Sequence, residues 1–134
     1  MEVTFAVLAD YANVSREGKV NVMGLFTIIY ADKFPATHPE MQLVFNLEAH
    51  AAERGRKKKV EIVLVDADGK RLQELRAELT VPTEGSSLTI GINQIVRLVG
   101  VTFEHPGQHE FVILVDGDKK ASVPFTLEKT SPGK

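Results

Sequence analysis

Apolar and polar residues alternate along most of the chain, in short runs separated by turn signals. β-branched residues are frequent in these runs, and no segment shows the spacing of an amphipathic helix. Alternation with a period of two is typical of strands that bury one face. The runs are numerous enough to form two packed sheets. We therefore expect an all-β fold, an immunoglobulin-like antiparallel β-sandwich of about 7–9 strands.

The first two runs predict a hairpin whose register follows from its apolar residues. With residues 15–18 as the loop, Tyr11 faces Val22 and Val7 faces Phe26. Every pair on that face is then apolar or small, whereas a slip of one residue would spoil the match.

A second hairpin is predicted at the end of the chain. With residues 117–119 as its loop, Phe111 faces Phe125 and His109 faces Leu127. These pairs gather most of the apolar side chains on one face. We expect residues 1–128 to form a single domain, and residues 129–134 have the composition of a flexible C-terminal tail.

The middle of the chain predicts further strands and one irregular segment. The two prolines of residues 33–40 predict an irregular crossing, because proline cannot donate to a central ladder. An Asp-Gly pair within residues 66–70 is typical of a hairpin turn. Two glycines interrupt the apolar run 88–103, which fits either one bent strand or two strands. Strands are also expected at residues 41–49, 60–66 and 75–81.

Composition narrows the class of protein. The 134 residues suffice for one hydrophobic core, and the absence of cysteine excludes disulfides, thiolate metal sites and a cysteine nucleophile. The N-terminal residues lack the basic and apolar regions of a signal peptide, and no apolar run is long enough to span a membrane. We therefore expect a cytoplasmic protein without a membrane partner. A formal net charge of −2 provides no field that would recruit nucleic acid.

Two histidines four residues apart raise the question of a metal site. His105 and His109 flank Pro106 and Gly107, with a glutamate next to each histidine. A zinc site needs three or four ligands, and in an extended chain each glutamate points away from its neighbouring histidine. The Pro-Gly pair instead favours a corner at which the chain passes from one sheet to the other. His109 could then bond back to the backbone through a ring nitrogen, as a tyrosine does at the corner of immunoglobulin-like sandwiches.

A basic cluster is the strongest charge feature. It could contact phosphates or an acidic protein, but no aromatic residue lies within it to stack on bases. We interpret it as a solvated loop with a possible interaction surface, and we expect no nucleic-acid partner. Its basic residues are Arg54, Arg56, Lys57, Lys58 and Lys59.

Neither catalysis nor a cofactor is indicated. The serines lie outside any nucleophile elbow, and no histidine and acid are ordered around them as in a catalytic triad. The glycines do not form a phosphate-binding loop before a helix. We therefore predict no catalytic residues and no cofactor.

Two segments resemble a known family. Residues 8–29 carry an acidic residue in the first strand, a Gly-Lys turn exit, and then Gly24 and Phe26 before a loop with prolines; residues 105–117 carry a Pro-Gly corner followed by a Val-Asp-Gly hairpin. This pattern is similar to a family of small uncharacterised bacterial proteins. The resemblance implies an immunoglobulin-like sandwich without an assigned activity. His109 stands where an aromatic residue often follows the corner in that family.

The sequence therefore predicts a non-enzymatic β-sandwich that acts as a protein–protein interaction or assembly module. Its partner would be another protein or a second copy, engaged through sheet edges or end loops. The alternative is a small-molecule or metal-binding domain centred on His105 and His109.

Overall fold

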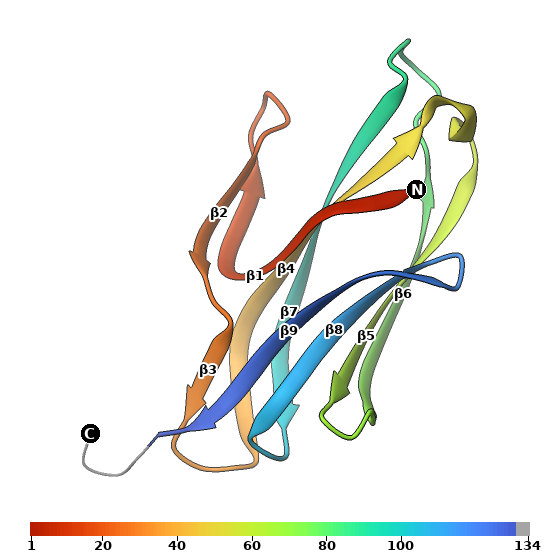
Figure 1. Ribbon diagram of the computed structural model, residues 1–134. Helices are drawn as coiled ribbons and strands as arrows, with labels where there is room; N and C mark the ends of the chain where they lie inside the picture. Colours follow the sequence, from red (N-terminus) through yellow and green to blue (C-terminus); the bar gives the residue numbers. More distant parts are fainter. Residues whose placement is uncertain (131–134) are drawn as a thin grey trace.

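The computed structural model, which describes residues 1–130, contains nine strands and one short 3-10 helix (Figure 1). The expectation of an all-β fold is confirmed. No helix in this part of the chain is long and apolar enough to cross a membrane. In chain order, the elements are β1 (Glu2–Val14), β2 (Val20–Leu25), β3 (Ile28–Ala31), β4 (Ala36–His50), η1 (Ala51–Glu53), β5 (Lys57–Asp66), β6 (Arg71–Thr80), β7 (Thr89–Phe103), β8 (Gly107–Val115) and β9 (Asp118–Lys129).

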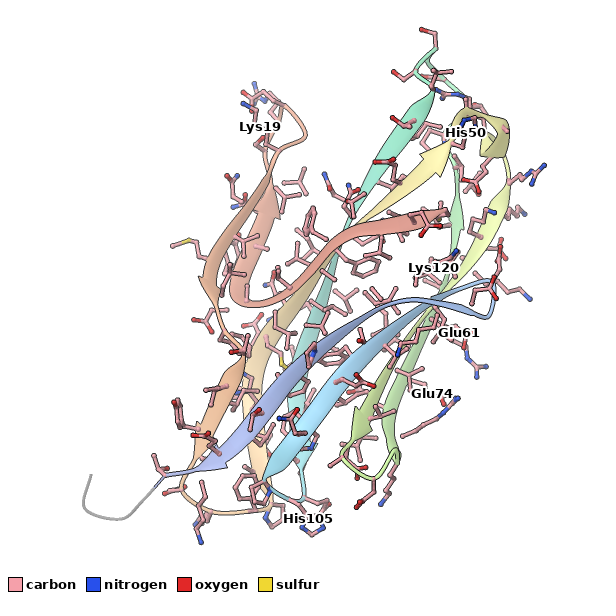
Figure 2. All side chains as sticks on the ribbon, in the orientation of Figure 1. Lys19, His50, Glu61, Glu74, His105 and Lys120 are labelled. Carbon is pink, nitrogen blue, oxygen red and sulfur yellow. The ribbon has the colours of Figure 1, made fainter. Side chains whose placement is uncertain are left out.

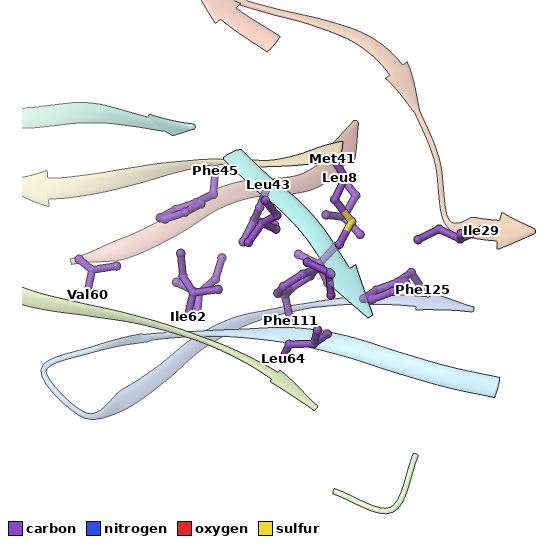
Figure 3. Close-up of a cluster of buried hydrophobic side chains, with 14 of the residues drawn as sticks. Leu8, Ile29, Met41, Leu43, Phe45, Val60, Ile62, Leu64, Phe111 and Phe125 are labelled. Carbon is purple, nitrogen blue, oxygen red and sulfur yellow. The ribbon is translucent and has the colours of Figure 1, made fainter. Parts of the chain in front are cut away.

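The strands form two sheets that enclose the core. The four-stranded sheet has the order β2-β1-β4-β7, and the five-stranded sheet has the order β3-β9-β8-β5-β6. All neighbours are antiparallel except β3 and β9, which are parallel. Alternate residues of both sheets point into the space between them, where they form the cluster of buried hydrophobic side chains shown in Figure 3. The core includes Leu8, Met41, Leu43, Phe45 and Leu47 from one sheet and Ile62, Leu64, Phe111, Ile113 and Phe125 from the other.

The longest ladder joins β4 to β7. It runs from the Ala36–Phe103 pair to the His50–Thr89 pair, so residues 89–103 form one strand and not two. The first residues of β4 had been expected in an irregular crossing, and this expectation is wrong for residues 36–40. Proline is tolerated at position 39 because β1 pairs with β4 only from Gln42 onward, which leaves the other side of β4 open there.

The first hairpin differs by one residue from the predicted register. Tyr11 pairs with Met23, not with Val22, because the turn contains five residues and closes through a bond from Ser15 N to Lys19 O. Tyr11 and Met23 consequently face solvent, while Ala12 and Val22 share the opposite face.

The predicted pair between Val7 and Phe26 is also wrong. After Leu25 the chain leaves the four-stranded sheet, and β3 pairs with β9 in the five-stranded sheet. Phe26 N donates to Leu8 O at 3.2 Å, just before this crossing. One continuous segment therefore bridges the edges of both sheets.

The distal part of the first hairpin covers the outer face of β4 and β7. Gln42 Oε1 accepts a hydrogen bond from Ala12 N at 3.0 Å, and Asn93 Nδ2 donates to Gly18 O in the hairpin turn at 3.2 Å. Val44 points away from the main core, since it alternates with Leu43, yet its exposed fraction is 0%. The hairpin thus creates a second, smaller buried layer, which includes the polar side chain of Gln42.

The last hairpin differs from the predicted register by two residues. His109 pairs with Phe125 and not with Leu127, because a bulge between Ile113 and Leu114 adds one unpaired residue to β9 and the loop contains only Asp116 and Gly117. Both residues have positive φ, 50° and 84°, as a two-residue hairpin turn requires. From His109 to Ile113 the displacement is two residues, which keeps each side chain on its face, so the predicted faces were correct there although the pairs were wrong.

The end of the domain lies further along the chain than expected. Lys129 belongs to β9, and Thr130 N donates to Ala31 O at 2.8 Å, so both residues of the predicted tail are part of the fold. The rest of that tail, residues 131–134, lies outside the described residues.

We expect Gly24→Ala to destabilise the fold more than Gly18→Ala. Both glycines have positive φ, +72° and +83°, but a Cβ at Gly24 would also overlap the Asp10 carboxylate, whereas nothing lies within 4 Å at Gly18. Each substitution should cost about 1 kcal/mol of strain, and Gly24→Ala should cost roughly 1–2 kcal/mol more. Urea denaturation measures the difference. In an Asp10→Ala background the excess should shrink, and an unchanged excess would contradict the contact.

Candidate interaction surface

His109 has a structural role at the corner between β7 and β8. Its Nδ1 lies 3.0 Å from Gly107 O, and since a carbonyl only accepts, Nδ1 must carry the proton. The buried ring stacks on Phe125 with centroids 5.7 Å apart and meets the edge of Phe103 at 5.1 Å. The corner carries the chain from the four-stranded to the five-stranded sheet. The predicted backbone bond and the predicted change of sheet are both confirmed.

His105 lies on the exposed part of the same corner (Figure 2). Together with His109 it lines a cavity of about 210 Å³ that the β5–β6 turn closes on the other side. That turn contributes Asp66 and Asp68, but no three histidine, cysteine or acidic side chains of the described residues are placed to hold a metal ion. Asp66 Oδ1 instead accepts bonds from the backbone of Asp68 and Lys70. The geometry favours a turn over a metal centre.

Arg54 of the basic cluster holds the loop between β6 and β7. Its guanidinium donates to the carbonyl oxygens of Pro82, Glu84 and Ser87, and the Ser87 contact measures 3.0 Å. A guanidinium can satisfy several carbonyls at once because its donors are fixed in one plane. Arg54 is therefore engaged within the chain.

Lys58 is also engaged, while the remaining basic residues point outward. Lys58 Nζ lies 3.6 Å from Glu53 Oε1 and 3.7 Å from Asp116 Oδ2. Arg56, Lys57 and Lys59 are exposed, and Lys57 lies 3.7 Å from Glu78 of β6. The five residues therefore do not form one free basic patch, because two of them stabilise the fold.

Glu53 connects η1 to the N-terminus and to β5. Its Oε1 lies 3.0 Å from the Met1 amino group, and its Oε2 accepts from His50 N at 3.0 Å. Burial opposes ionisation, but these hydrogen bonds and the charge of Lys58 outweigh it, so the pKa of Glu53 is lowered. The Glu53 side chain is only 16% exposed, so its ionised carboxylate has a structural role.

The exposed apolar residues concentrate in the N-terminal third. Of nine large apolar side chains that are exposed among the described residues, seven lie within residues 5–30. Met23 and Leu25 of β2 are 66% and 64% exposed, which is unusual for a strand residue of this size. We call the following set the N-terminal apolar surface: Phe5, Tyr11, Val14, Met23, Leu25, Ile28 and Tyr30.

A cavity of about 350 Å³ adjoins this surface. It lies where the chain crosses between the sheets, bounded by β1, the β2–β3 crossing and β9. Leu25 belongs to both the cavity and the N-terminal apolar surface. None of the residues that line the cavity is charged; they are Ala6, Val7, Leu8, Leu25, Phe26, Thr27, Ser122, Val123 and Pro124.

Sequence reasoning missed the N-terminal apolar surface. It placed Tyr11 and Val22 on one inward face, whereas the correct register exposes Tyr11 and Met23. A signal was present in Gly24, because a glycine within an otherwise regular strand often marks an irregular register.

The fold and site define a two-sheet, all-β domain with no metal cluster among its described residues. The chain belongs to a family of unknown function, DUF6941, whose model matches residues 4–128. No curated protein matches the sequence. Among solved structures, the alkylpurine DNA glycosylase AlkC of Pseudomonas fluorescens, bound to DNA containing an abasic site analog, is similar over 76% of this chain, with 21% identity and a TM-score of 0.46. This chain spans 27% of that glycosylase chain.

We expect Glu53→Gln to lower the free energy of unfolding at pH 7 by about 1–2 kcal/mol, because the charge-assisted bonds are lost. A lowered pKa in the folded state means that this stabilisation is present above the unfolded value, near 4.5, and is lost as the pH falls through the folded pKa. The two proteins should therefore converge in acid. Urea denaturation between pH 7 and pH 3 tests this, with exposed Glu17→Gln as the control. A constant difference across that range would refute the assignment.

Proposed function

We propose that this chain is a non-enzymatic binding domain whose partner is another protein. The observation that carries the proposal is the concentration of exposed apolar side chains in residues 5–30. Among these residues, Tyr11 and Met23 are cross-strand partners in the β1–β2 hairpin. Large apolar side chains that are exposed side by side are rare on monomeric domains and mark interaction sites. A partner that presents apolar side chains would remove this surface from water.

The cavity beside Leu25 suits such a partner. Its volume of about 350 Å³ is at the lower limit of ligand pockets and can receive one or two large side chains. Protein interfaces often centre on an anchor side chain in a pocket, surrounded by apolar contacts that exclude water. Here the exposed residues Met23 and Ile28 flank the crossing segment that forms the pocket wall.

The same features argue against a nucleic-acid partner. No lysine or arginine lines the cavity, and phosphate contacts dominate nucleic-acid affinity. In the basic cluster, Arg54 and Lys58 are engaged within the fold.

The proposal includes the type of sandwich, the source of the protein and its location in the cell. We infer an immunoglobulin-like sandwich, on the basis of the corner between β7 and β8 and the bond from His109 to Gly107 O. We infer a bacterial source from the family resemblance of residues 8–29 and 105–117. We infer a cytoplasmic location, which a fold without disulfides permits.

The N-terminal apolar surface can be tested with a double variant, Met23→Ser with Leu25→Ser. A partner is first identified by capture on tagged wild-type protein after nuclease treatment, and its affinity is then measured by calorimetry with purified proteins. We expect the variant to bind roughly tenfold or more weakly, because apolar anchors contribute over 1 kcal/mol each.

The matched control is Leu88→Ser with Val99→Ser, which removes exposed apolar side chains elsewhere. The control should bind like the wild type. Equal losses in both variants, or a captured partner that depends on nucleic acid, would overturn the proposal.

A further inference from the structure

Strand β6 is an edge of the five-stranded sheet with no partner on its outer side among the described residues. Its ten residues, Arg71–Thr80, contain no glycine, proline or lysine, and a bulge interrupts its pairing with β5 only at Leu72, near the start of the strand. Proteins commonly protect exposed edges with such residues, with bulges or with very short strands. The other edge strand of this sheet, β3, has four residues. Most of β6 is therefore available for pairing.

The hydrogen bonds between β5 and the β6 region show which backbone groups of β6 point away from β5, toward the unpaired edge. Val81 N donates to Arg56 O, and Gly55 N donates to Val81 O, so Val81 directs its backbone groups toward β5. Because the direction alternates along a strand, residues 75, 77 and 79 also face β5. The N–H and C=O groups of residues 74, 76, 78 and 80 consequently point outward.

The side chains of β6 are self-complementary about Ala77. We propose that β6 pairs antiparallel with β6 of a second copy, with the two-fold axis at Ala77. In this register Arg76 faces Glu78 of the second copy, and Glu78 faces its Arg76. Leu75 and Leu79 face each other in the same reciprocal way. Charges therefore meet opposite charges on the outer face, while apolar residues meet apolar residues on the inner face.

Other registers are less favourable. An axis at Arg76 would place Arg76 against itself and Glu74 against Glu78. An axis at Leu75 opposes Glu74 and Arg76 but sets Leu79 against Arg71. An axis between two residues would bring inward side chains opposite outward ones. The sequence of β6 thus selects Ala77.

The pairing would extend an existing row of charges across both copies. Within one chain, Glu78 is opposite Lys59 and Arg76 is opposite Glu61. Glu61 and Glu74 project from the outer face of the β5–β6 pair in Figure 2. Across the axis the row would read Lys59, Glu78, then Arg76 and Glu61 of the second copy, with alternating sign. Arg76 forms ion pairs with Glu61 and Glu74, and Glu78 forms one with Lys57. These pairs lie at the surface, where Arg76 and Glu78 are 70% and 56% exposed, so both side chains have room to adjust.

The inner face of β6 also lacks a complete cover. A cavity of about 190 Å³ lies between β6 and β7, and its walls include Leu75, Ala77 and Leu79 of β6 and Val96 of β7. Phe45 of the core also lines it. The leucines of the second copy would adjoin this opening and reduce the contact of the core with water. This contact does not use the N-terminal apolar surface and is independent of the proposed function.

Charge reversal provides a test with internal rescue. We expect the wild-type protein to form a dimer in a concentration-dependent way in analytical ultracentrifugation. In Arg76→Glu alone, an acidic residue at position 76 of each copy faces Glu78 of the other. In Glu78→Arg alone, a basic residue at position 78 of each copy faces Arg76 of the other. Each variant should therefore dimerise roughly tenfold or more weakly. An equimolar mixture of the two variants restores opposite charges at both positions and should form the heterodimer.

Two controls separate this result from loss of folding. Arg97→Glu, an equivalent reversal on the exposed face of β7, should leave the dimer intact. Glu78→Pro removes an outward N–H without affecting the β5 ladder and should abolish dimerisation, with the circular dichroism spectrum unchanged. A wild-type protein that stays monomeric at millimolar concentration, or a mixture that fails to associate, would overturn the proposal.

Discussion

The β4–β7 ladder is the constraint on which the rest of the fold depends. It is the longest pairing in the molecule, from Ala36–Phe103 to His50–Thr89, and it carries buried residues on both of its faces. Its inner face packs on the five-stranded sheet through Leu43 and Phe45. Its outer face would expose Val44 if the first hairpin did not bend over it. The position of that hairpin, and so the exposure of Tyr11 and Met23, follows from the need to cover this second face.

The chain passes between the two sheets several times, and two of these crossings, β7–β8 and β2–β3, have different consequences. At the β7–β8 corner, the His109 ring is bonded to Gly107 O and packs against two aromatic rings, Phe103 and Phe125. At the β2–β3 crossing, the chain pairs with β1 before the crossing and with β9 after it, and the cavity lies at the point where the partner changes. The ladder with β1 ends at Leu25 and the ladder with β9 begins at Ile28, so residues 26 and 27 belong to neither ladder, and the cavity lies beside them. The candidate pocket is thus a consequence of the topology.

The sequence predicted the faces of strands better than their pairings. Alternation identifies which residues share a face, so the last hairpin kept its faces despite a displacement of two residues. The first hairpin lost them, because its loop has five residues and not four. The burial of Gln42 had no local signal, since it depends on a bond from Ala12, which lies thirty residues earlier. The His109 bond was predictable because its acceptor lies two residues away. The candidate surface was not, because it arises from the register of β1 and β2.

The two edges of the five-stranded sheet are protected to different degrees. Thr126 N donates to Thr27 O, so the N–H side of position 124 faces the open edge of β9, where Pro124 offers no donor. In β6 no proline removes a backbone donor from the open edge, and the charges on its outer face instead determine which pairing register is favourable. The order Glu74, Arg76, Glu78 opposes like charges when the axis lies at Arg76 or Glu78 and unlike charges when it lies at Ala77. Such a pattern does not block strand addition; it restricts which strand can be added and in which register. An edge that must avoid every partner would carry a proline or an inward charge, whereas an edge that must admit one partner needs a selective pattern of this kind.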